Sequence, residues 1–73
     1  MEKSYQVVLQ RGSRDIETLY WSGSLEETTR LARLVALQWN AEKLLIFKLD
    51  GSGAGLICGE QRPFGDHEPH STD

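Results

Sequence analysis

Hydrophobic and polar residues alternate in two short segments near the start of the chain. Residues 5–10, YQVVLQ, and residues 16–21, IETLYW, are rich in β-branched and aromatic side chains, which is typical of β-strands. The segment between them, RGSRD, contains Gly12 and Ser13, two residue types that suit tight turns. The pattern predicts a β-hairpin at this end of the chain.

A helical pattern follows in residues 24–40, SLEETTRLARLVALQWN. Ser24 is a favourable N-cap, and Glu27 stands three residues later, which is the spacing of a capping box. Asn40 can adopt the left-handed conformation that often ends a helix, so we expect a helix from about residue 24 to 40. At 100° per residue, the arc that faces the core contains Leu25, Thr28, Leu31, Ala32, Val35, Ala36 and Trp39.

Two more strands are expected after the helix. Residues 43–49, KLLIFKL, form a short apolar run that ends at an Asp-Gly turn, and residues 55–61, GLICGEQ, form the returning strand. The order of elements predicts an α+β fold of ββαββ type, with a four-stranded, mainly antiparallel sheet and one helix packed on one face. We expect one domain over residues 1–64 and a disordered, polar C-terminal tail over residues 65–73.

Two leucines of the helix fall outside the core-facing arc. On the helical wheel, Leu34 and Leu37 lie on the side that carries the charged residues, and Arg30 and Ala41 fall beside them. Single exposed leucines are ordinary on soluble proteins, so these two need no special role. The functional interpretation is a partner-binding surface formed by Leu34, Leu37, Arg30 and Ala41.

The strands carry apolar residues on both faces of the expected sheet. In the third strand, Leu45 and Phe47 alternate with Leu44 and Ile46, so each face receives large apolar side chains. One helix can cover only one face, and large exposed apolar patches usually mark interaction sites. A second protomer is the simplest cover, since two-fold dimers are the commonest oligomers. The sequence therefore predicts a homodimer that uses either the outer helix surface or the open sheet face.

Charge is balanced along the body of the chain. The net charge is −3, and the excess comes from Asp66, Glu68 and Asp73 in the expected tail. A neutral body has no electrostatic attraction to a phosphate backbone, so a nucleic-acid partner is disfavoured relative to a protein.

Nucleic-acid binding is the alternative function, and it would use Arg11, Arg14 and exposed aromatic residues. Trp21 and Trp39 could stack on bases, although we expect both in the core. No run approaches the roughly 20 apolar residues that cross a membrane, and the first residues lack the apolar segment of a secretion signal. With a single cysteine as well, we expect a cytoplasmic protein and no membrane partner.

Residue combinations that support catalysis are scarce. Cys58 is the only cysteine and has no histidine near it in sequence, so we expect a half-buried or buried structural thiol. The glycine-rich segment at 50–55, DGSGAG, leads into a strand rather than a helix, so we expect a hairpin loop and not a phosphate site. His67 and His70 lie in the tail, where metal ligands are not preorganised. We expect no enzymatic activity, no cofactor and no metal.

The layout resembles small uncharacterised ββαββ proteins of bacteria and phages, in domain-of-unknown-function families. The matching segments are YQVV at 5–8, SLEETTRLA at 24–32, the Asp-Gly turn at 50–51 and the Phe-Gly pair at 64–65. The sequence departs from that pattern at Thr28, where those families favour alanine, and in the GSGAG loop. The resemblance brings no catalytic residues. Because some phage proteins of similar layout inhibit host defence, it implies protein binding.

Overall fold

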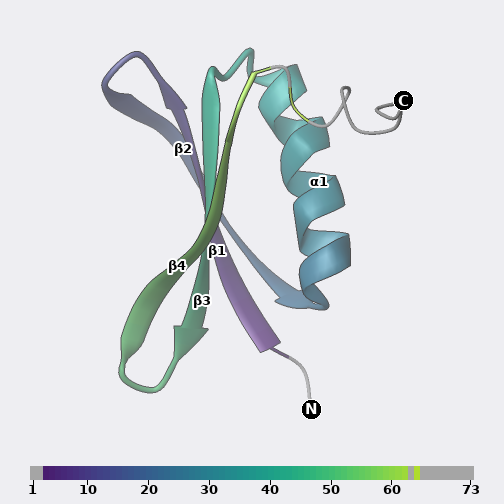
Figure 1. Cartoon of the computed structure of the whole chain (residues 1–73), viewed down its shortest axis with the longest axis vertical. Helices are drawn as coiled ribbons and strands as arrows, with labels where there is room; N and C mark the ends of the chain where they lie inside the picture. The colour runs from purple at the N-terminus through teal and green to yellow at the C-terminus, as the bar shows by residue number, and fades with distance from the viewer. Residues whose placement is uncertain (1–2, 63, 65–73) are drawn as a thin grey trace, which may run out of the picture.

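The computed structural model describes residues 3–62 and residue 64, and it confirms the α+β ββαββ fold (Figure 1). The elements in chain order are β1 (Lys3–Arg11), β2 (Arg14–Gly23), α1 (Leu25–Gln38), β3 (Lys43–Asp50) and β4 (Gly53–Gln61). Each element forms where the sequence predicts it. The expected disordered tail, with its two histidines, lies outside the described residues.

The four strands form one antiparallel sheet in the order β2-β1-β3-β4, so β2 and β4 are its edges. Strands β2 and β3 are not neighbours, because both pair with β1, and the connection through α1 therefore crosses over β1. The register places Val7 of β1 opposite Leu19 of β2 and Ile46 of β3. Alternate residues share a face, so the sheet has one face covered by α1 and one open face.

The ends of α1 form as the local sequence indicates. The Ser24 side chain accepts a hydrogen bond from the backbone N–H of Glu27 at 3.1 Å, and Asn40 adopts a φ of 56° just after the helix. The last turn of α1 contains no basic residue. Instead, Arg11 of β1 donates from Nε to the carbonyl oxygen of Asn40 at 3.2 Å, and Arg62 donates to the Asn40 side chain at 2.9 Å. Arg11 of β1 and Arg62, the residue after β4, thus supply the positive charge that a helix C-terminus favours.

The helix contacts the sheet through small side chains. Thr28, Ala32 and Ala36 are spaced four residues apart along one face of α1, and each is at most 2% exposed. Small residues let the helix backbone approach the sheet closely, so the large side chains of the core come mostly from the strands. The buried residues contributed by the sheet and the C-terminal segment are Tyr5, Val7, Leu9, Leu44, Ile46 and Phe64.

The helical wheel was wrong at the two ends of the helix: at its first residue, Leu25, and after its last residue, Gln38. Leu25 is 37% exposed and Trp39 is 47% exposed, so neither belongs to the core. Ala41 shows the opposite error, because it is fully buried and cannot be part of an outer helix surface. The regular 100° step ends with Gln38, and the left-handed turn at Asn40 then directs Ala41 back towards the sheet.

Candidate functional site

The open face of the sheet carries no charged residue over three adjacent rows of positions. Each row crosses all four strands, because the registers align one residue from each strand. In the order β2, β1, β3, β4 the rows are Ser22–Ser4–Leu49–Ala54, Tyr20–Gln6–Phe47–Leu56 and Thr18–Val8–Leu45–Gly59. The chain is 26% charged, so an even spread would place about three charged residues among these twelve positions. We call these three rows the uncharged face.

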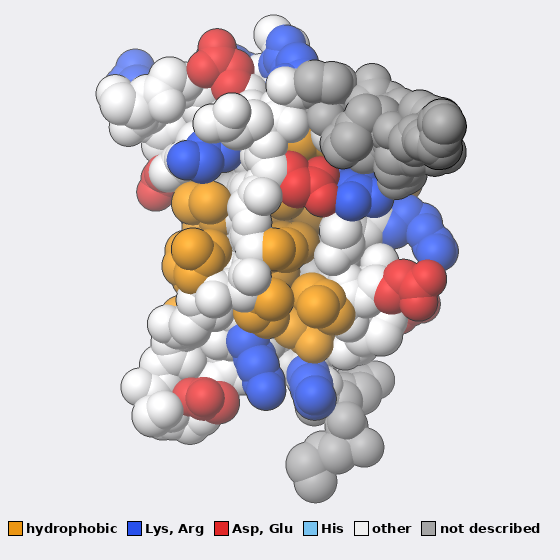
Figure 2. Space-filling view, in the orientation of Figure 1, with side chains coloured by type: hydrophobic (Ala, Val, Ile, Leu, Met, Phe, Trp, Pro, Cys, Tyr) orange, Lys and Arg blue, Asp and Glu red, His pale blue; other side chains and the backbone are white. Residues whose placement is uncertain are grey.

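Exposure on the uncharged face increases towards the edges of the sheet. Val8, on an inner strand, is only 8% exposed although the helix lies on the other side of the sheet. Tyr20 on β2 is 67% exposed, and Leu56 on β4 is 61% exposed. Figure 2 shows hydrophobic side chains gathered around the middle of β4, on both sides of its backbone. The large apolar residues of both edge strands are therefore accessible to a partner.

A polar row closes the uncharged face at one end. It contains Asp15, Gln10, Lys43 and Gln61, one residue from each strand. The Gln10 side chain donates a hydrogen bond to the Asp15 carboxylate at 2.8 Å. An apolar centre with a polar margin is the usual anatomy of a protein–protein interface.

The outer surface of α1 presents both leucines that the helical wheel placed there. Leu34 is 55% exposed and Leu37 is 58% exposed. Arg30 is also exposed, and its guanidinium lies 3.8 Å from the carboxylate of Glu26 one turn earlier. Three residues of the predicted partner-binding surface thus lie on the exposed helix, and only Ala41 is misplaced.

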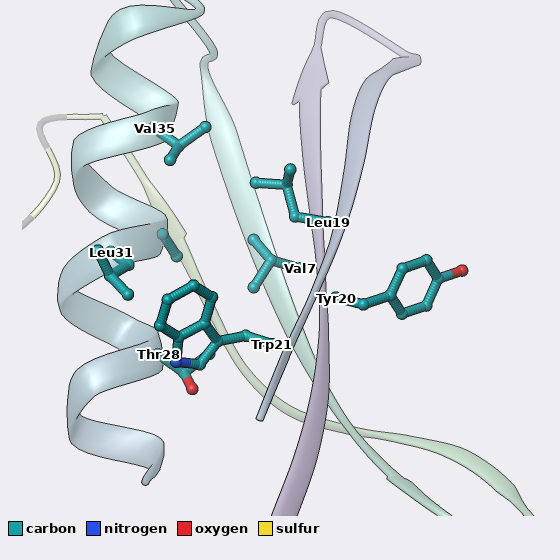
Figure 3. Close-up of a pocket in the computed structure, with 8 residues that line it drawn as sticks. Val7, Leu19, Tyr20, Trp21, Thr28, Leu31 and Val35 are labelled. Carbon is teal, nitrogen blue, oxygen red and sulfur yellow. The ribbon is translucent and has the colours of Figure 1, made fainter. Parts of the chain in front are cut away.

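An apolar groove lies between α1 and the edge strand β2 (Figure 3), with a volume of about 260 Å³. Its lining consists of Val7, Leu19, Tyr20, Trp21, Thr28, Leu31, Ala32 and Val35. Figure 3 shows Leu19 and Trp21 of β2 pointing towards the helix, whereas the Tyr20 side chain points to the opposite side of the sheet. This groove was not predicted from the sequence, because it depends on the distance between the helix and β2.

Trp21 forms one wall of the groove and is 44% exposed, so the expectation that it belongs to the core was wrong. Alternation along β2 correctly places it on the same face as Leu19. Its exposure follows from the position of β2 at the edge of the sheet, where the helix covers the strand incompletely.

The opposite side of α1 is fastened to β4. Arg33 donates to the carboxylate of Glu60 through Nε at 3.0 Å and through a terminal nitrogen at 2.6 Å. Both side chains are partly buried, and such two-point ion pairs are stronger than single ones. The helix is therefore anchored towards β4, while its side towards β2 presents Leu31 and Val35 to the groove.

Cys58 lies half-buried on β4, opposite Ile46, as expected for a structural thiol. Burial, and to a smaller extent the negative charge of Glu60, raises the pKa of the Cys58 thiol. The thiolate is the reactive form of cysteine, so this environment disfavours nucleophilic chemistry at neutral pH.

We expect Cys58 to react with iodoacetamide at neutral pH more slowly in the folded protein than in the urea-unfolded chain. Both the raised pKa and the partial burial reduce the thiolate that the reagent can reach. The measurement is the rate of mass increase by mass spectrometry, with free cysteine as the reference. Equal rates in the folded and unfolded protein would show that the thiol is not shielded from the reagent and that its pKa is not raised.

The glycine-rich segment forms a hairpin, as predicted, but the turn is shorter than the predicted loop: it consists of residues 51 and 52, and Gly53–Gly55 already pair in β4. Asp50 pairs with Gly53, and the Asp50 carboxylate accepts hydrogen bonds from the hydroxyl and the backbone N–H of Ser52, each at 2.8 Å. These two hydrogen bonds hold the pKa of the Asp50 carboxyl below its usual value. The polar atoms of the loop thus serve the turn itself.

Within residues 3–62 and 64, no three potential metal-ligating side chains form a cluster. In the same part of the chain, no helix is long and apolar enough to cross a membrane. No family model, no curated protein and no solved structure matches this chain. The features that bear on function are therefore those of a small α+β domain with three exposed apolar surfaces: the uncharged face, the outer helix and the groove.

Proposed function

We propose that this protein is a small, non-enzymatic protein-interaction module that forms a two-fold homodimer through the uncharged face, and that it acts in the cytoplasm. The observation that carries the proposal is the uncharged face itself, with Tyr20, Phe47 and Leu56 in one row across the sheet. Gln6 of β1 stands between Tyr20 and Phe47 in this row, and its side chain donates to the Tyr20 hydroxyl at 3.4 Å. The resemblance to bacterial and phage ββαββ proteins agrees with a binding role.

The lack of charge on this face suits a second copy of the same chain. In a two-fold dimer both protomers present the same patch to each other. A charged residue near the centre of the patch would therefore lie close to its own copy, which has the same charge. An uncharged face avoids that repulsion, and each Å² of apolar surface removed from water contributes roughly 25 cal/mol. A domain of 73 residues has a small core, so association would also supply stability that the single chain lacks.

The outer helix surface is the second candidate for the interface. Leu34 and Leu37 are as exposed as the edge residues of the sheet, but Glu26 and Arg30 lie on the same helix surface and would have to be desolvated or rearranged. Charged residues are depleted at the centres of interfaces, which favours the uncharged face.

A protein partner is also favoured over a nucleic acid. Arg11, one of the two arginines of the nucleic-acid hypothesis, donates hydrogen bonds to the carbonyl oxygens of Trp39 and Asn40 at the end of α1. Its guanidinium is therefore already engaged in holding the helix, and phosphate contacts would compete with that role.

The dimer is tested by light scattering on the wild type and on two double variants. Tyr20→Glu/Leu56→Glu places carboxylates on the uncharged face, and Leu34→Glu/Leu37→Glu places the same number on the outer helix at similarly exposed positions. We expect the wild type and the helix variant to have twice the mass of one chain. The sheet variant should be a monomer, with a circular dichroism spectrum like that of the wild type.

Two results would contradict this proposal in different ways. A monomeric wild type at high protein concentration would rule out self-association. A helix variant that becomes monomeric while the sheet variant remains dimeric would move the interface to Leu34, Leu37 and Arg30.

A further inference from the structure

The groove has a free strand edge as one of its walls. Strand β2 pairs only with β1, so part of its backbone N–H and C=O groups point outwards from the sheet. Residues 17–22 pair with β1 in unbroken register, because the irregularity lies between Leu9 and Gln10. Proteins often protect such edges with proline, charged side chains or bulges; β2 has its charges and its irregularity at residues 14–17, and residues 18–22 contain no charged residue and no proline. This edge is therefore available to another extended chain.

The groove lies where the side chains of an added strand would point. Alternate side chains of a strand paired with β2 would lie on the same face as Leu19 and Trp21, which is the face that borders the groove. The volume of about 260 Å³ is just below the range of roughly 300–1,000 Å³ that is usual for small-molecule pockets. The groove thus suits apolar side chains of a peptide better than a whole small ligand.

Leu34 lies on α1 next to the helical wall of the groove, although it does not line the groove itself. It lies three residues after Leu31, and residues three apart on a helix are neighbours on its surface. Its side chain is 55% exposed, so Leu34 adds exposed apolar surface beside Leu31.

Negative charge stands at both ends of the groove. Glu17 lies on the same face of β2 as Leu19, two residues before it. At the other end, a carboxylate oxygen of Glu27 and the indole nitrogen of Trp21 lie 3.1 and 3.4 Å from the position that a Cβ on Gly23 would occupy. The groove lining itself contains no charged residue. At the Gly23 end Lys3 of β1 pairs with Gly23 on the same face, so the negative charge is least compensated at Glu17. The complementary ligand therefore has an apolar centre and a positive charge at the Glu17 end above all, with a second one facing Glu27.

We propose that β2 and the groove bind an extended peptide segment of another protein by strand addition. The backbone of the peptide pairs with residues 17–22, its large apolar side chains enter the groove, and flanking Lys or Arg residues face Glu17 and Glu27. In this mode main-chain hydrogen bonds provide affinity, and the side-chain pockets provide specificity. The proposal does not depend on the dimer, because the groove and the uncharged face lie on opposite sides of the sheet.

The test is a nuclear magnetic resonance titration of the isotope-labelled full chain with a synthetic peptide, Lys-Thr-Leu-Thr-Leu-Thr-Lys, blocked at both ends. Its alternation puts both leucines and both lysines on one face, with the spacing of Glu17, Leu19, Trp21 and Gly23. We expect saturable shifts confined to the backbone amides of residues 17–22 and 28–35. A peptide with glutamate in place of both lysines should bind at least about fivefold more weakly.

Two further controls separate the strand edge from the groove. Two N-methylated peptides are compared, one methylated at the odd residues and one at the even residues. The peptide whose methyl groups replace the N–H groups that point to β2 should show no saturable binding, and the other should still bind. Leu31→Lys, which puts a charge into the groove, should weaken binding by about tenfold or more. Leu37→Lys makes the same change on the outer helix, at a residue that is 58% exposed, and should leave the affinity unchanged.

The proposal is overturned if millimolar peptide causes no saturable shifts, or if the shifts map to Phe47 and Leu56 of the uncharged face and leave residues 28–35 unchanged. It is also overturned if raising the protein concentration without peptide shifts the groove residues of α1 (28–35) together with residues 17–22, because the occupant of the groove would then be a second copy of this chain. Shifts at Thr18, Tyr20 and Ser22 without shifts at residues 28–35 report only the dimer through the uncharged face.

Discussion

Replacing Leu44 by alanine should lower the free energy of unfolding by about 2–5 kcal/mol. Leu44 is fully buried between the helix and the sheet, in one cluster with Leu9 and Ile46, so the substitution leaves a cavity that its neighbours cannot fill. Small domains have a total stability of about 5–15 kcal/mol, so this single change would remove a large part of it. Urea denaturation followed by circular dichroism gives the difference.

Leu37→Ala is the matched control for that prediction. It removes the same atoms from a leucine that is 58% exposed, and surface changes of this kind usually stay within about 0.5 kcal/mol. A comparable loss in both variants would contradict the assignment of Leu44 to the core and Leu37 to the surface.

Replacing Ala36 by leucine should also destabilise the protein, by about 1–3 kcal/mol. Ala36 is fully buried where α1 approaches the sheet, and a larger side chain there must push the helix outwards or adopt a strained rotamer. Leucine and alanine both have high helix propensities, so the loss measures crowding rather than helix formation. Thermal or urea denaturation gives the difference in stability.

Arg30→Leu introduces the same residue on the exposed surface of the same helix, and its stability should stay close to that of the wild type. If Ala36→Leu were as stable as the wild type, the helix would have to stand farther from the sheet than the buried stripe of Thr28, Ala32 and Ala36 indicates. The groove beside that stripe would then differ in shape as well.

The two proposed binding surfaces share the edge strand β2. Tyr20 belongs to the uncharged face, whereas Leu19 and Trp21 on either side of it face the groove (Figure 3). Because successive residues of a strand point to opposite faces, one strand can serve a dimer partner on one side and a peptide on the other. A peptide added to β2 would extend the sheet without covering Phe47 or Leu56.

The sequence alone determined the elements of this fold, because their signals act over a few residues. Ser24 caps the helix through a neighbour three residues away, Asn40 ends it through its own backbone conformation, and the Asp50 carboxylate holds its turn through Ser52. Exposure of Leu34 and Leu37 followed from helical periodicity in the same way. Each of these features needs only local geometry, which the order of residues fixes.

Only the tertiary structure decided how these elements meet. The strand order makes β2 an edge, and the anchoring of α1 to β4 through Arg33 leaves the groove on its other side with Trp21 exposed. Ala41 was misplaced for a related reason, since the turn after the helix returns it to the core. Such contacts join residues far apart in the chain. They depend on packing between elements, and the hydrophobic periodicity of a single segment carries no information on that packing.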